Sequence, residues 1–193
     1  MLLCMIWNTP VKRLISSTAH TDLKVENNLD LSSEYWCMLY IWIIASWTSE
    51  NDIVDGPRIN AAELEDIVRN NGNPHRILYA FEKDEQGVES LLVGTSLIEA
   101  SKEDPNEAEV RLFSVRPSHQ SRGLGRLIFD ASLNRMRELG LRTAVLRVFD
   151  TRGGLIDWYK KLGFKEAGVL KYEGASGKLK VDGVNFVILK QDL

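Results

Sequence analysis

The sequence predicts a single α/β (α+β) domain built on a mixed, twisted sheet. Three observations support this prediction. The chain has 193 residues, a length typical of one domain. Its 44% hydrophobic and 26% charged residues match the composition of ordinary globular proteins. From residue 60 onward, short apolar runs alternate with amphipathic segments, as they do where strands and helices pack on one sheet.

The composition also excludes several classes of protein. The 14 Gly and 5 Pro show no collagenous or low-complexity bias. The net charge of -3 lacks the excess of basic residues typical of nucleic-acid binders, so we expect no nucleic-acid partner. Cys4 and Cys37 cannot form a disulfide framework, and His20, His75 and His119 lack the spacing of a metal site. We therefore expect free thiols, no metal, and a location in the cytoplasm or nucleus.

The first 50 residues differ from the rest, and we treat residues 1–50 and 51–193 as separate units. The segment 35–47 (YWCMLYIWIIASW) is apolar on nearly all sides. As a helix it would measure about 20 Å, shorter than the ~30 Å core of a bilayer. We expect it to pack as a helix on the domain, with membrane-surface or partner contact as the alternative. No basic region precedes the apolar start, so we expect no secretory signal.

The next elements are a helix and a hairpin. Asn60 precedes AAELEDIVRN, and Glu63 stands where a capping box requires a glutamate, so a helix is expected to start after Asn60. The apolar runs 77–81 (ILYAF) and 90–98 (SLLVGTSLI) read as strands. The charged stretch between them contains Gly87, which favours a hairpin connection.

The second half alternates strands and helices. Residues 109–115 (EVRLFSV) form a predicted strand that Pro117 ends, and residues 124–139 form an amphipathic helix that ends at Gly140. Residues 143–149 (TAVLRVF) are a further strand. The remaining predicted elements are a helix at 155–162 and strands at 164–170 and 184–189.

A basic block lies in the middle of this acidic chain. Residues 111–152 carry nine arginines and only three acidic residues, Asp130, Glu138 and Asp150, which gives a local net charge of +6. Such a block attracts a polyanion, because local potential steers charged ligands whatever the net charge is. The alternative is a set of solvated arginines on helix and strand surfaces.

The turn between the strand at 109–115 and the next helix is rich in glycine. Gly123 and Gly125 leave its backbone accessible, and a helix N-terminus presents unpaired N–H donors that favour phosphate. Arg122 and Arg126 add donors beside it. The turn is neither a P-loop nor a dinucleotide fingerprint, since Ile128 occupies the third glycine position of the latter. Alone, it is also compatible with a purely structural turn.

Two motifs give this turn a more specific meaning. Gln120–Gly125 (QSRGLG) resembles the Q/R-x-x-G-x-G/A pyrophosphate loop of the GNAT superfamily of N-acetyltransferases, and residues 155–164 (LIDWYKKLGF) resemble the second motif of that family. The resemblance covers roughly residues 60–189. It implies a GNAT-like acyl-CoA N-acyltransferase fold, in which the two central parallel strands, here 109–115 and 143–149, splay apart and acetyl-CoA enters the gap.

The resemblance also implies which residues bind acetyl-CoA. Backbone groups of Phe113 and Val115 pair with the pantetheine and the acetyl carbonyl, and N–H groups of the loop hold the pyrophosphate. The implied coenzyme-binding residues are Phe113, Val115, Gln120, Ser121, Arg122, Gly123, Leu124, Gly125 and Arg126.

The catalytic residues that the resemblance implies are Tyr159 and Glu109. Tyr159 matches the family tyrosine that faces the coenzyme sulfur as general acid. Full proton transfer from a phenol of pKa about 10 to a thiolate of pKa about 8.5 is uphill by roughly 2 kcal/mol, so we expect stabilisation by a hydrogen bond. Glu109 is the candidate general base, and Asp150 or ordered water is the alternative.

The sequence departs from the family pattern at Arg152 and Leu155, and its N-terminal half shows no recognisable acceptor pocket. The expected activity is acetyl transfer from acetyl-CoA to a primary amine, more readily of a small molecule than of a protein. Protein or peptide N-acetylation and a non-catalytic acyl-CoA-binding sensor or interaction module are the alternatives. Five acidic residues suggest a cationic acceptor: Glu99, Glu103, Asp104, Glu107 and Glu109.

Overall fold

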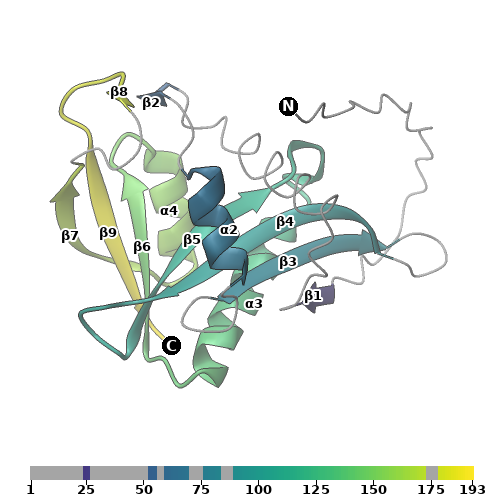
Figure 1. Ribbon diagram of the computed structural model, residues 1–193. Coiled ribbons are helices and arrows are strands. Elements are labelled where there is room, and N and C mark those ends of the chain that lie inside the picture. Colours follow the sequence, from purple (N-terminus) through teal and green to yellow (C-terminus); the bar gives the residue numbers. More distant parts are fainter. Residues whose placement is uncertain (1–23, 27–51, 56–58, 70–75, 84–88, 173–177) are drawn as a thin grey trace.

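The computed structural model describes residues 24–26, 52–55, 59–69, 76–83, 89–172 and 178–193 (Figure 1). The strands are β1 (Lys24–Glu26), β2 (Val54–Asp55), β3 (Arg76–Lys83), β4 (Glu89–Ala100), β5 (Glu107–Val115), β6 (Thr143–Phe149), β7 (Lys165–Lys171), β8 (Lys178–Leu179) and β9 (Asn185–Asp192). The helices are α2 (Ala61–Arg69), α3 (Leu124–Glu138) and α4 (Gly153–Lys161), with a 3₁₀ turn, η2, at Pro117–His119.

The helices and strands predicted from residue 60 onward are all present, with ends that differ by a few residues. Asn60 caps α2 as expected, because its Oδ1 accepts a hydrogen bond of 2.8 Å from the Glu63 amide. The largest difference is at the C-terminus, where β9 continues to Asp192 along its pairing with β6. The helix predicted at 35–47 lies outside the described residues.

Three short strands were not predicted. β1 lies within residues 1–50 and pairs with β3, so part of that segment belongs to the sheet of the 51–193 unit. β2 and β8 pair with each other in a separate two-stranded sheet. Strands of two or three residues are too short to show alternation in the sequence, and only pairing defines them.

The main sheet is mixed, as predicted, with the strand order β1-β3-β4-β5-β6-β9-β7. All neighbours are antiparallel except β5 and β6, which are parallel. Their pairing is brief and ends with Glu109 opposite Val145. Beyond that point the two strands separate toward their C-terminal ends, as Figure 1 shows. The expected splay of these strands is therefore present.

Helices cover both faces of this sheet (Figure 1). α2 packs through Leu64, Ile67 and Val68 on one face, which we call the α2 face. α3 and α4 pack on the other face, the α3 face, where Phe129 of α3 and Tyr159 of α4 belong to one buried cluster. The sheet is thus the middle of three layers, and its two faces carry different side chains.

A β-bulge interrupts β5 after the strands have separated. The register with β4 shifts between Thr95, which pairs with Ser114, and Leu97, which pairs with Arg111. Leu112, inside the bulge, has φ 46°, and its carbonyl accepts a 2.9 Å hydrogen bond from Thr95 Oγ1. The bulge changes the direction of the residues that follow it, because the extra residue shifts the alternation of the strand.

Close packing between α3 and β4 depends on small residues. Ser132 Oγ of α3 donates a 2.8 Å hydrogen bond to Ser96 Oγ of β4, and both side chains are buried. A Cβ at Gly94 would overlap Ile128 Cδ1 and lie 3.1 Å from the Ser114 carbonyl oxygen. A side chain at Gly94 therefore requires the buried Ile128 to change its position.

We predict that Gly94→Ala lowers the free energy of unfolding by about 1–3 kcal/mol, because the added methyl group overpacks a buried contact. Gly154→Ala is the matched control: nothing lies within 4 Å of its Cβ position in α4, and alanine favours the helix. Urea denaturation of both variants measures the difference. Equal stabilities of Gly94→Ala and the wild type would contradict the close packing described here.

Candidate active site

The separation of β5 from β6 leaves main-chain groups of β5 without a strand partner. The Arg116 amide donates a 2.8 Å hydrogen bond to the Val93 carbonyl of β4. Since successive residues of a strand point their N–H and C=O groups to opposite sides, those of Val115 and Phe113 point away from β4. They face the side from which β6 has departed. On that side, among the described residues, only Gln120 Nε2 bonds to them, donating to the Val115 carbonyl at 3.0 Å.

The turn that follows β5 presents a row of unpaired amides. Leu127 is the first residue of α3 whose N–H bonds within the helix, to the Gly123 carbonyl at 3.2 Å. The N–H groups of residues 121–126 have no acceptor in the described part of the chain. Ser121 and Gly123 both have positive φ, 61° and 81°, which curls the backbone before the helix starts. This arrangement is suited to an anion such as a diphosphate.

Side chains from neighbouring strands hold this turn in place. His119 Nε2 lies 3.1 Å from Glu82 Oε2 at the end of β3, and the Arg116 Nε donates to the Leu92 carbonyl of β4 at 3.1 Å. Leu124 and Ile128 of α3 pack in a buried cluster with Val93 of β4. The amides of the turn therefore have fixed positions relative to the C-terminal end of β5.

The two arginines of the turn differ in availability. Arg126 Nε donates a 2.6 Å hydrogen bond to Asp130 Oδ2, one turn further along α3. Arg122 is exposed, and its side chain makes no hydrogen bond or ion pair with a described residue. Of the two, only Arg122 has its full set of donors available for an anion at the turn.

Glycine has different uses at the two positions of this turn. The backbone at Gly123 is left-handed, and residues with a side chain adopt this conformation only at a cost in free energy. A Cβ at Gly125 would make ordinary contacts, 3.7 Å from Val115 Cγ2 and 3.8 Å from Phe113 Cζ. The protein itself therefore tolerates a small side chain at Gly125, and only a ligand close to the backbone would exclude one.

Tyr159 lies in the core between the sheet and α4, and only 4% of it is exposed. Its ring lies 5.3 Å from Phe129 and 4.9 Å from Trp158, measured between centroids. No described residue forms a hydrogen bond with its hydroxyl. Burial raises the pKa of the Tyr159 phenol, so it is a weaker acid than an ordinary tyrosine. This change makes full proton transfer to a thiolate less favourable than expected from the sequence.

Glu109 lies at the point where the strands separate, with 16% of its side chain exposed. Ala108 and Val110 on either side of it belong to the buried cluster of the α3 face, so Glu109 points to the α2 face. Burial raises the pKa of its carboxyl, and the charges of Arg147 and Arg111 offset part of this rise. A carboxylate with a raised pKa is a better proton acceptor than an exposed glutamate.

Arg147 of β6 is the nearest charged partner of Glu109. Its Nη1 lies 3.4 Å from Glu109 Oε2. Arg147 was not predicted from the sequence, because no motif includes it. One feature of the sequence could have identified it: Arg147 is the single charged residue of the apolar strand 143–149. Strand alternation places its side chain on the face opposite to that of Leu146 and Val148.

The other charged candidates have structural partners. Asp150 Oδ2 accepts hydrogen bonds from the Asn185 amide at 3.1 Å and from its Nδ2 at 3.0 Å, which ties the end of β6 to the start of β9. Arg152, before α4, pairs with Asp52. Both residues thus contribute to holding the loops around β6.

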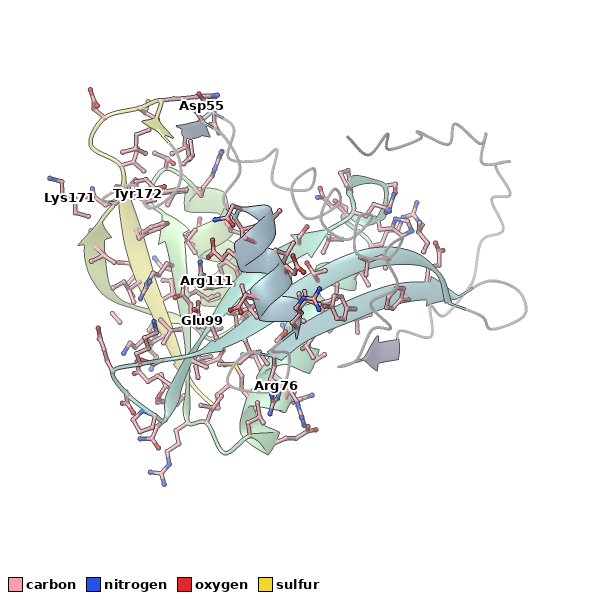
Figure 2. All side chains as sticks on the ribbon, viewed as in Figure 1. Asp55, Arg76, Glu99, Arg111, Lys171 and Tyr172 are labelled. Atoms are coloured by element: carbon pink, nitrogen blue, oxygen red, sulfur yellow. The ribbon has the colours of Figure 1, made fainter. Side chains whose placement is uncertain are left out.

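The acidic residues that suggested a cationic acceptor are mostly neutralised. Glu99 pairs with Arg111, and Figure 2 shows these two side chains beside each other on the α2 face. Glu107 pairs with Lys190 of β9, and Glu109 pairs with Arg147. Three of the five carboxylates are therefore neutralised by ion pairs, which weakens the support for the expected cationic acceptor.

In the ranges set out above, no group of three His, Cys, Asp or Glu side chains has the arrangement of a metal site. None of the helices in those ranges combines the length and apolar character that crossing a membrane requires.

Comparisons of sequence give a family. A model of the Acetyltransferase (GNAT) family matches residues 36–164, which include the loop and both separated strands. A mycothiol acetyltransferase of Nocardia farcinica is 37% identical over 75 residues, which are 39% of this chain and 25% of that protein. The chain thus aligns with about a quarter of the length of this curated relative.

Comparisons of structure give the same fold at low identity. A ribosomal-protein-alanine N-acetyltransferase from Brucella melitensis matches with a TM-score of 0.66 and 16% identity, covering 89% of this chain and 100% of that one. A GNAT superfamily phosphinothricin acetyltransferase from Sinorhizobium meliloti, in complex with AcCoA, matches with a TM-score of 0.66 and 16% identity, covering 89% of this chain and 88% of that one.

We predict that Arg122→Glu weakens binding of acetyl-CoA about tenfold or more, because it replaces the available guanidinium at the turn by a repelling charge. Arg142→Glu, the same charge change at the start of β6, is the control and should bind as the wild type does. Calorimetric titration at two salt concentrations measures both. Equal affinities of the two variants would exclude Arg122 from the anion site.

Proposed function

This chain belongs to the Acetyltransferase (GNAT) family, and from that membership we propose that it transfers the acetyl group of acetyl-CoA to a primary amine of a small molecule. Transfer takes place by direct attack while both substrates are bound. The observation that carries the proposal is the early separation of β5 from β6 next to a turn of unpaired amides. We propose that the reaction takes place in the cytoplasm, with the nucleus as the alternative.

The main-chain groups of the site fit the two ends of acetyl-CoA. The diphosphate carries the charge that the N–H groups of residues 121–126 and Arg122 favour. The amides of the pantetheine arm supply donors and acceptors for Phe113 and the neighbouring groups of β5, which otherwise lack a strand partner. The Gln120 side chain already occupies one lone pair of the Val115 carbonyl, so that carbonyl has a single position left for the arm.

The transfer forms one bond and breaks another. The amine nitrogen attacks the thioester carbonyl carbon, a C–N bond forms, and the C–S bond breaks. The proton that the amine loses goes to the Glu109 carboxylate, directly or through water, and the thiolate leaves as coenzyme A. The half-buried position of Glu109 on the α2 face and the raised pKa of its carboxyl support this role.

Tyr159 would stabilise the leaving sulfur without giving up its proton. Its hydroxyl has no hydrogen-bond partner in the described residues, and burial raises the pKa of the phenol. A neutral phenol that donates a hydrogen bond to a thiolate gains a charge-assisted interaction and avoids the unfavourable transfer. The protonated thiol then forms with a proton from solvent.

Two measurements test the proposal as a whole. Calorimetric titration determines whether the full chain binds acetyl-CoA, and a thiol-release assay across small amines and peptide N-termini determines whether it transfers the acetyl group. Binding with turnover of at least one small amine supports the proposal. Binding without thiol release by any amine would instead identify a non-catalytic sensor, and turnover of peptides alone would identify a peptide acetyltransferase.

We predict that Glu109→Gln lowers kcat/KM by about 10²- to 10⁴-fold, the range of general base catalysis. In the wild type, activity should rise with pH as Glu109 ionises. Because burial raises the pKa of Glu109, this rise should lie at higher pH than for an exposed glutamate. The pH profile of kcat/KM is measured with amines of different pKa. The ionisation of the substrate amine moves with the amine chosen, whereas the ionisation of Glu109 does not. If the Glu109→Gln variant showed the same rise of kcat/KM with pH, the general base would be another group.

We predict that Tyr159→Phe lowers kcat about ten- to a hundredfold, because the thiolate loses a charge-assisted hydrogen bond. Stability should change little, since no described residue bonds to the hydroxyl. Initial-rate assays measure kcat, and thermal melts measure stability. Unchanged turnover would remove Tyr159 from the mechanism, and Trp158→Phe in the same helix is the control for altered packing.

A further inference from the structure

Arg147 occupies a defined position at the separated strands. It follows Val145, the last residue of β6 that pairs with β5, by two positions. Leu146 and Val148 on either side of it belong to the buried cluster of the α3 face, so Arg147 points to the α2 face, as Glu109 does. About half of its side chain, 48%, is exposed. A long cationic side chain therefore stands next to the candidate base where the two strands part.

The donors of Arg147 are almost unused. Its contact with Glu109 is an ion pair of 3.4 Å through one nitrogen, and it donates no hydrogen bond to any described residue. By contrast, Arg111 on the same face is hydrogen-bonded to Glu99. Arg122, Arg142 and Arg147 are arginines of the described ranges whose side chains make no hydrogen bond with a described residue, whereas seven others do. Arg122 lies at the anion-binding turn, and Arg142 lies at the far end of β6, before the strands part.

The charged groups around Arg147 are of both signs. Glu99 and Glu109 pair with Arg111 and Arg147, and Glu63 of α2 also acts on Arg111. A ligand with one positive and one negative charge leaves the net charge of this region unchanged, since each end replaces one half of the Glu109–Arg147 pair. A ligand with a doubly charged phosphate would place excess negative charge beside two carboxylates.

We propose that the acceptor amine is an amino acid whose carboxylate binds the guanidinium of Arg147 while its amino group lies at Glu109. In an amino acid one carbon separates the two charged groups, and the protein presents their complements in direct contact. The guanidinium fork matches a carboxylate in two parallel hydrogen bonds. This inference rests on the proposed function and names the class of its substrate.

An amine without the carboxylate meets a less complementary site. When its amino group occupies Glu109, Arg147 loses its ion-pair partner and gains none from the ligand. Sites built to bond a polar group discriminate strongly against analogues that lack it, because a charged group is left unpaired. Arg147 is accordingly a specificity-determining residue.

Matched pairs of acceptors test this inference. Each pair consists of an amino acid and the amine that remains after its decarboxylation, such as phenylalanine with phenethylamine, or arginine with agmatine. Thiol release by the full chain gives kcat/KM for both members. We expect the amino acid to be preferred about ten- to a hundredfold in at least one pair, the effect of one charge-assisted contact.

Variants then assign the preference to a residue. Arg147→Gln should bring the two members of a pair to similar kcat/KM values, whereas Arg142→Gln should keep the wild-type preference. Thermal melts and calorimetric binding of acetyl-CoA check that both variants are folded. Because these readouts are independent of the acceptor, a misfolded variant is recognised and replaced by Arg147→Met, which keeps the apolar stem.

The outcomes separate this inference from the proposed function. Turnover of amines with no preference for the carboxylate, or a preference that survives in Arg147→Gln, would overturn the inference and leave the acetyl transfer standing. Thiol release by none of the amines, with acetyl-CoA bound, would overturn the proposed function and this inference with it. A preference that disappears in Arg147→Gln alone supports both.

Discussion

The structure depends on one feature of the sheet, the departure of β6 from β5 after only a few paired residues. In an uninterrupted sheet the main-chain groups at the C-terminal end of β5 would bond to β6. Here β6 turns to β9, with which it pairs along its whole length, and β5 keeps only β4. Main-chain donors and acceptors that lose a strand need another partner. A ligand with its own amides is such a partner, and this requirement explains why a sheet with a gap is suited to a pantetheine arm.

Backbone distortion is concentrated close to this gap. Leu112, Ser121 and Gly123 have positive φ, and each lies between the point of separation and the start of α3. Such conformations persist only when surrounding contacts stabilise them. The Thr95 hydroxyl bonds to the Leu112 carbonyl, and His119 and Glu82 connect the turn to β3. The amides of the turn are therefore held in a fixed arrangement before any anion arrives, which lowers the ordering cost of binding.

The two faces of the sheet have separate physical characters. On the α3 face, Phe113, Phe129 and Trp158 pack into an aromatic group that fixes α3 and α4. On the α2 face, the same strands carry Glu109 and Arg147, which are paired and partly exposed. Strand alternation produces this division, since neighbouring residues point to opposite faces. The apolar face is tightly packed, and the polar face carries charged, partly exposed groups at the same level of the sheet.

The sequence alone determined the local elements and the glycine-rich turn after β5. Asn60 before α2, the glycines of residues 120–125 and the alternation in 143–149 act through neighbouring residues, so their effect can be read from a short segment. Tertiary structure decided the other features of the site, because each of them depends on residues that are distant in the sequence. The bulge at Leu112 arises from pairing with β4, the Glu109–Arg147 contact joins two strands that begin to part there, and burial alone weakens Tyr159 as an acid. Pairing and burial are properties of the assembled sheet, and no short segment contains them.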